Sequence, residues 1–242
     1  MSFHTERAHN EPLHTEPDTD ELALRGAFET WLREAVRVPG LHLRLANTLS
    51  MLEHIGSVKI ARTQAGNRIT AQTLRHLAEE TRHAQVLKRI VHGIDPGGAP
   101  DYDDRWLLAG PTARGYFARL DASVRSATRG MAGDAGEAAY LLVTWLVELR
   151  AAWLYPVYQV AMDGAGIRFS VRGIIGEEDR HLEEVEEGMK RLGLDGDGAL
   201  PGLLREERSS FRRLATAMMH DADHDISAPS AGDGAGAANI GS

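Results

Sequence analysis

The sequence of 242 residues contains no cysteine. This absence excludes disulfide bonds, thiolate nucleophiles, iron–sulfur clusters and cysteine-bound zinc, so any metal must be held by nitrogen and oxygen ligands. Long apolar runs are also missing, and none approaches the roughly 20 residues that a membrane-spanning helix needs. Acidic residues outnumber basic residues, 35 to 27, so the formal net charge is -8. That balance argues against nucleic acid as the main partner, and we expect no membrane partner either.

Both ends of the sequence are poor in large apolar side chains. Residues 1–20 are polar and hold prolines and acids, with neither the apolar core of a signal peptide nor the arginine-rich pattern of a transit peptide. We therefore expect a cytoplasmic protein. Residues 221–242 are mostly small or polar. Because neither segment can bury enough surface to order itself, we predict disordered tails at 1–20 and 221–242 around a single helical domain at 21–220.

Between these ends the apolar residues recur at helical spacing, and the sequence shows no alternating strand of useful length. The first predicted helix follows residues 18–20 and stops at Pro39, and the others cover about 41–63, 69–92, 111–128, 136–163, 168–192 and 201–219. The four long core helices form two short-looped hairpins with a long connection between them. This layout predicts the all-α class, as a ferritin-like four-helix bundle with a long crossover and additional flanking helices.

Glu-x-x-His pairs are the first sign of a metal site, because residues three apart share one face of a helix. The sequence contains four such pairs. Two fall within residues 1–20, next to proline and without helical periodicity, and we attribute them to chance. The other two, Glu80 with His83 and Glu178 with His181, each lie on the apolar stripe of a long predicted helix. Only these two pairs indicate a site.

Each of these pairs follows a predicted helix that carries one carboxylate on its own apolar stripe, Glu53 or Glu148. The separations are similar, 27 residues to Glu80 and 30 residues to Glu178, as expected for two equivalent hairpins. Four buried carboxylates would repel one another by roughly 3 to 4 kcal/mol per close pair. Two divalent ions would neutralise them if both imidazoles are neutral. We therefore predict a two-metal site with the ligands Glu53, Glu80, His83, Glu148, Glu178 and His181.

Each of the two Glu-x-x-His pairs that indicate a site is part of a repeated five-residue string. Residues 79–83 read Glu-Glu-Thr-Arg-His and residues 177–181 read Glu-Glu-Asp-Arg-His. Both strings resemble the (Asp/Glu)-Glu-x-Arg-His signature of bacterial di-iron monooxygenase subunits and acyl-carrier-protein desaturases. Residues 41–192 thereby resemble the ferritin-like di-iron carboxylate superfamily. The size and six-ligand set are also similar to those of small stand-alone di-iron oxygenases.

This resemblance implies a cofactor of two iron ions, although manganese or a mixed pair uses the same ligand types. By the resemblance, Glu80 and Glu178 bridge the ions, Glu53 and His83 complete one of them, and Glu148 and His181 complete the other.

The resemblance also gives each ligand histidine a second partner. The acid before each bridging glutamate would hold the far nitrogen of the histidine in the other string, and the arginines of the strings could then tie down those acids. The pairs are Glu177 with His83 and Glu79 with His181, and the arginines are Arg82 and Arg180. Simple surface ion pairs between residues three apart on one helix are the alternative for these four residues.

Two more residues could belong to the site. His76 lies one turn before Glu80 on the same face, and it is either a seventh ligand or a hydrogen-bonded core histidine. Tyr155 lies two turns after Glu148, roughly 10 Å along the helix axis. It either takes part in a redox relay or fills the core with the other aromatic residues.

A two-metal site with nitrogen and carboxylate ligands suits reduction of dioxygen or peroxide. We expect an oxidoreductase, a non-haem di-iron oxidase or oxygenase that oxidises a small or medium organic substrate with electrons from a separate reductase or ferredoxin. Small residues near the ligands would leave room for an apolar cavity: Ala46, Gly56, Ala84, Ala151 and Ala152. A ferritin-like iron-binding or ferroxidase protein and a non-catalytic bundle stapled by metals are the alternatives. A homodimer is an arrangement that the sequence allows.

Overall fold

The computed structural model describes residues 17–63, 69–131, 135–194, 196 and 198–227. Over these residues the protein consists of seven α-helices and one short 3-10 helix, with no strand, which confirms the all-α prediction. The helices are α1 (Thr19–Ala35), α2 (Pro39–Thr63), α3 (Ala71–Ile94), α4 (Gly110–Ala127), α5 (Ala135–Gly164), α6 (Arg172–Arg191) and α7 (Leu200–Ser227), and the 3-10 helix is η1 (Asp104–Trp106). None of the described helices has both the length and the apolarity that a bilayer crossing requires.

The helix starts follow local chemistry that the sequence shows. The side chain of Asp18 accepts a hydrogen bond from the backbone N–H of Glu21, and Thr70 caps α3 in the same way. The sequence predicts that the first helix stops at Pro39, but α1 already ends at Ala35 and Pro39 is the first residue of α2. Proline suits that position because the first N–H of a helix has no partner within the helix.

Two helix boundaries differ from the prediction because of contacts with distant residues. Helix α6 begins at Arg172 rather than near 168, since the side chain of Gln159 on α5 accepts hydrogen bonds from the preceding segment. Helix α7 continues to Ser227, seven residues into the expected tail at 221–242. Within that part Asp221 pairs with Arg44 at 2.8 Å, and Ala222 is buried. The remainder of that segment, and residues 1–16 of the other expected tail, lie outside the described residues.

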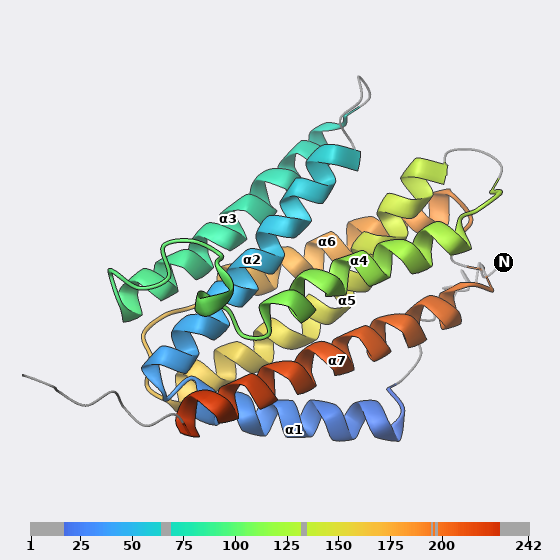
Figure 1. Ribbon diagram of the computed structural model, residues 1–242. Coiled ribbons are helices and arrows are strands. Elements are labelled where there is room, and N and C mark those ends of the chain that lie inside the picture. Colours follow the sequence, from blue (N-terminus) through green and yellow to red (C-terminus); the bar gives the residue numbers. More distant parts are fainter. Residues whose placement is uncertain (1–16, 64–68, 132–134, 195, 197, 228–242) are drawn as a thin grey trace, which may run out of the picture.

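Two helical hairpins form the centre of the molecule (Figure 1). Helix α2 packs against α3, and α5 packs against α6, while α2 also contacts α5 and α3 contacts α6. The long connection between the hairpins contains η1 and α4. Helices α1, α4 and α7 contact one another or α5 and cover one side of the four central helices, whereas the opposite side is formed by α3 and α6. The predicted bundle with added flanking helices is therefore the observed architecture.

A buried cluster of charges attaches the flanking helices to the bundle. Arg150 on α5 lies 2.9 Å from Glu21 on α1 and 2.7 Å from Glu207 on α7. Tyr116 on α4 donates a hydrogen bond to Glu207 at 2.7 Å. All four residues are buried. The guanidinium of Arg150 thereby connects α5 to α1 and α7, and Glu207 extends the cluster to α4. Trp145 and other large residues of α5 are fully enclosed in the core.

Candidate metal centre

The six predicted ligands come from all four central helices and meet between them. They are Glu53 on α2, Glu80 and His83 on α3, Glu148 on α5, and Glu178 and His181 on α6. Five of them are buried, and the side chain of Glu53 is only 11% exposed. Each lies on the stripe of its helix that packs inward: Glu178, for example, falls between the buried Ile174 and Val185 at helical spacing. The helical spacing that places apolar residues on the buried face of each helix therefore places the carboxylates on that face too.

The ligand atoms form two overlapping groups. The first, the Glu53 group, comprises Glu53, Glu80, His83 and Glu178; the second, the His76 group, comprises His76, Glu80, Glu148 and His181. Within each group, one ligand atom from every residue lies within 4.8 Å of the others. Glu80 belongs to both groups, and Glu178 also approaches the second, with its Oε2 at 3.5 Å from Nδ1 of His181. These two adjacent buried groups could hold two metal ions.

Many polar atoms at this centre are buried and have no hydrogen-bond partner among the described residues. They are His76 Nε2, Glu80 Oε1, His83 Nδ1, Glu148 Oε2, Glu178 Oε1 and His181 Nδ1. Nδ1 of His83 lies 2.9 Å from Oε1 of Glu178, but without the alignment of a hydrogen bond. An unsatisfied buried polar atom costs about 1–3 kcal/mol, and more when it is charged. Bound cations would satisfy all six atoms together, so these residues fit a pair of metal ions.

Burial and crowding also change the acidity of the centre. Burial, with a further contribution from the Glu80 carboxylate, raises the pKa of Glu53 to about 8. Burial and the nearby Glu178 raise the pKa of Glu148 well above its usual value. Burial alone would lower the pKa of His83, but its contacts with Glu178 and Glu53 raise it to about 12. Without metal these groups must share protons, and a divalent cation would replace those protons.

Each of the two predicted ligand histidines forms a hydrogen bond with an acid of the opposite hairpin, through the ring nitrogen that faces away from the centre. Nε2–H of His83 donates to Glu177 at 2.7 Å, and Nε2–H of His181 donates to Glu79 at 2.7 Å. In a neutral ring this hydrogen bond leaves the lone pair on Nδ1, the nitrogen that faces the carboxylates, where a metal ion would take the place of the second proton. The crossed pairing implied by the two repeated strings is therefore present as geometry.

The arginines of the two strings bind the same acids. Arg82 lies 2.5 Å from Glu177 across the hairpin interface but 4.0 Å from Glu79, three residues earlier on its own helix. Arg180 lies 2.7 Å from Glu79 across the same interface. The contacts between helices are thus shorter than the surface pairing that was the alternative. Because the arginine side chains are 45% and 39% exposed, this network runs from the ligands to the surface between α3 and α6.

Two tyrosines of α5 touch the centre. The hydroxyl of Tyr155 donates a hydrogen bond to Oε1 of Glu53, so this residue contacts a predicted ligand directly. The sequence relates Tyr155 only to Glu148 on its own helix and does not show the contact with α2. The hydroxyl of Tyr140 lies 3.1 Å from Nδ1 of His76. Tyr140 is absent from the predicted site, although its position two turns before Glu148 on the same stripe is a usable signal.

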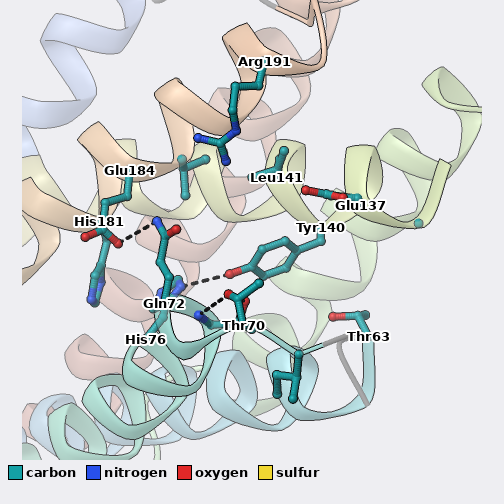
Figure 2. A pocket seen from close by; sticks show the side chains of 14 residues that line it. Thr63, Thr70, Gln72, His76, Glu137, Tyr140, Leu141, His181, Glu184 and Arg191 are labelled. Atoms are coloured by element: carbon teal, nitrogen blue, oxygen red, sulfur yellow. Dashed lines mark hydrogen bonds between the residues drawn. The ribbon is translucent and has the colours of Figure 1, made fainter. Parts of the chain in front are cut away.

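Two cavities reach the centre on either side of Tyr140. One, of about 320 Å³, lies between α3, α5 and α6 and has mainly polar residues around it, including Gln72 and Glu184, with His76 and His181 at its inner end (Figure 2). The figure shows Tyr140 pointing across this space to His76, and Gln72 bridging to Glu184.

The other cavity, of about 350 Å³, is more apolar and lies between α2, α4 and α5. Its apolar wall consists of Gly56, Ile60, Phe117, Val124, Ala139, Val143 and Val147. Glu80, Glu148 and His76 also line it, so it opens directly onto the predicted ligands. Of the five small residues expected to leave room for a cavity, only Gly56 lines this one. Ala46 and Ala84 are packed in the core, and Ala152 lies beside a different cavity.

No protein-family model matches the sequence, and neither the curated proteins nor the solved structures give a match. What the structure establishes is a helical bundle with two adjacent buried groups of histidine and glutamate that could hold metal ions.

Proposed function

We propose that this protein is a non-haem di-iron oxidoreductase that activates dioxygen and oxidises an apolar organic substrate held beside the metal centre. The observation that carries this proposal is the apolar cavity of about 350 Å³, which is lined by Glu80 and Glu148 at one end. A site built only to staple the bundle needs no such space, because close packing around the ligands would stabilise it better.

Each element of the centre has a role in this proposal. The ligands of the Glu53 group and the His76 group would hold the two ions, with Glu80 shared between them. Iron bound there would supply electrons to dioxygen. Glu177 and Glu79 hold the ligand imidazoles in one orientation and one tautomer, which keeps the ligand nitrogens in place. The apolar wall of the second cavity would favour an apolar substrate over water beside Glu80 and Glu148.

The apolar cavity also indicates the path by which the substrate would reach the metal centre. Its inner end is formed by deeply buried ligands, Glu148 among them, whose side chain is 3% exposed. Its outer end is formed by Arg125, which is exposed, and by Lys59, which pairs with Asp121. Between the two ends the wall is apolar. This gradient suits a substrate with an apolar body that approaches the metals through the space between α2, α4 and α5.

The first test is anaerobic. The protein is loaded with Fe(II) without oxygen, and the bound iron is counted. It is then mixed rapidly with oxygenated buffer while the visible absorption is followed. We expect about two ions per chain and a transient change in absorption, and the matched Glu178→Ala variant should bind less iron and react more slowly. Fully loaded protein that does not react with oxygen at all would contradict the proposal.

Two competing functions give different results in simple measurements. An iron-storage protein should form a large hollow shell with many irons per chain, so light scattering on the purified protein separates storage from catalysis. A metal-stapled bundle should be inert to both oxygen and peroxide when loaded. A catalytic centre also needs an electron donor, for which we propose a separate reductase or ferredoxin, and multiple turnovers should occur only when such a donor is added.

A further inference from the structure

Three histidines at the centre share one arrangement. In each ring, one nitrogen is engaged by a partner on another helix: Glu177 for His83, Glu79 for His181 and Tyr140 for His76. The second nitrogen of each ring is buried and has no hydrogen-bond partner in the part of the chain that the structure describes. Two of these rings belong to the predicted ligand set. The third, His76, is 5% exposed and is oriented in the same way.

The free nitrogen of His76 lies among the carboxylates that His181 also faces. Nε2 of His76 is 3.4 Å from Oε1 of Glu80 and 3.2 Å from Oε1 of Glu148. Nδ1 of His181 is 3.6 Å and 3.8 Å from the same two oxygens. The two rings lie beside each other, with centroids 4.1 Å apart. With metal–ligand bonds of roughly 2.0–2.2 Å, neighbouring ligand atoms around one ion are separated by roughly 3 Å, so these four atoms need to move little to share an ion.

Tyr140 is suited to hold His76 in the form that binds metal. Its hydroxyl can accept the proton of Nδ1–H, which leaves the lone pair of the ring on Nε2, the atom that faces Glu80 and Glu148. The surroundings of His76 differ from those of His42, a buried histidine outside the centre. His42 is also buried and is bonded to a tyrosine hydroxyl, that of Tyr158 at 2.7 Å, but it forms no ion pair with a carboxylate among the described residues.

We propose that His76 is a seventh metal ligand and that the two ions therefore occupy chemically unequal sites. The ion of the His76 group has two imidazole ligands, whereas the ion of the Glu53 group has one. Imidazole binds iron and cobalt more strongly relative to manganese than carboxylate does. The His76 group thus takes up Fe(II) or Co(II) first, and the carboxylate-rich Glu53 group fills second and discriminates less against Mn(II). This inference depends on the metal centre of the proposed function but not on any reaction with oxygen.

The test is a Co(II) titration of metal-free protein without oxygen, followed by its visible absorption and by equilibrium dialysis. The unaltered protein should bind two ions in two distinguishable steps. In His76→Ala the step that belongs to the His76 group should weaken by at least about 100-fold, while the other changes little. Added imidazole should restore the lost step, since both cavities give access to the position of His76. Restoration would not follow from a role in packing alone.

Matched variants complete the design. His42→Ala removes the other buried histidine–tyrosine pair, about 16 Å along α2 from Glu53, and should bind both ions normally. If His76→Ala loses its helical circular dichroism, Tyr140→Phe replaces it, and the same step should weaken by about 10-fold.

Three results would overturn the assignment. These are two unaltered steps in folded His76→Ala, equal weakening of both steps, and a loss that imidazole does not restore. If instead the unaltered protein binds no Co(II), the metal centre itself is wrong. If it binds two ions in the expected way but does not react with oxygen when loaded with iron, the inference about His76 holds and the proposed reaction fails.

Discussion

Removing the two metal ions should lower the free energy of unfolding, because each ion would be held by a ligand group that only the folded protein brings together. At a free metal concentration of 100 times the dissociation constant of the weaker site, each ion adds at least about 2.7 kcal/mol to the free energy of unfolding, so two ions add at least about 5 kcal/mol. For a chain of this size, 1 kcal/mol corresponds to roughly 2–4 °C in the melting temperature, which gives a rise of about 10–20 °C on loading. That increment is comparable to the total stability of many domains.

The geometry predicts how single substitutions divide this increment. Glu53→Gln removes a ligand from the Glu53 group only, so the contribution of the ion in the His76 group, at least about half of the metal-dependent rise, should remain. Glu80→Gln removes a ligand from both groups and should abolish most of it. The exposed Glu187→Gln on α6 is the matched control and should keep the full rise. Comparing each variant with and without metal matters, because a lost carboxylate also relieves repulsion in the metal-free protein.

The assay is thermal unfolding by circular dichroism, with chelator or with Co(II), under conditions of reversible unfolding. Equal loss of the metal-dependent rise in Glu53→Gln and Glu80→Gln would refute the sharing of Glu80. A melting temperature that does not respond to metal in the unaltered protein would refute the two-ion interpretation altogether.

Three further predictions concern other parts of the structure. Arg150→Met leaves buried carboxylates without their cation and should lower the free energy of unfolding by about 3–5 kcal/mol in denaturant titrations. The added change Glu207→Leu should recover most of this loss. A loss below about 1 kcal/mol in Arg150→Met would contradict the assignment of a buried ionic network. Gly56→Ala should reduce metal content, since its Cβ would lie 3.1 Å from a ligand carboxylate oxygen, whereas Gly176→Ala, with nothing within 4 Å, should leave metal content unchanged in elemental analysis. Burial lowers the pKa of His42 to about 4 from 6.5, so the unfolded chain takes up the proton first as the pH falls. Stability should therefore drop by about 3 kcal/mol between pH 6.5 and pH 4, and His42→Gln should show a drop smaller by that amount in unfolding titrations.

The crossed network of acids and arginines suggests why the repeated string has its particular order. In each string the second glutamate, Glu80 or Glu178, and the histidine point to the centre, while the acid before them reaches the histidine of the other hairpin. One residue of offset on a helix turns a side chain by about 100°, enough to separate these two directions. The string therefore supplies a pair of predicted ligands from its own hairpin and a hydrogen-bond acceptor for the histidine of the opposite one.

The sequence alone was sufficient to predict the type of each element and to predict that the side chains of six named residues meet in the core. Apolar spacing identified seven helices, because burial of a helical stripe is a local pattern. The same criterion separated Glu80/His83 and Glu178/His181 from two chance pairs near the N-terminus. Similar separations along two hairpins then placed Glu53 and Glu148 at the level of these pairs, since the rise per residue of a helix is constant.

Only the tertiary structure decided which groups from different helices touch. The contact of Tyr155 with Glu53, the pairing of His76 with Tyr140 and the unequal composition of the two ligand groups all depend on how far neighbouring helices slide and rotate. The end of α7 was likewise decided by the contact of Asp221 with Arg44 on α2. Local spacing carries no information about such offsets, which are set by the packing of side chains across helix interfaces. The sequence therefore indicated six of the side chains that meet at the centre, and the fold determined which further residues contact them and how the two ligand groups differ.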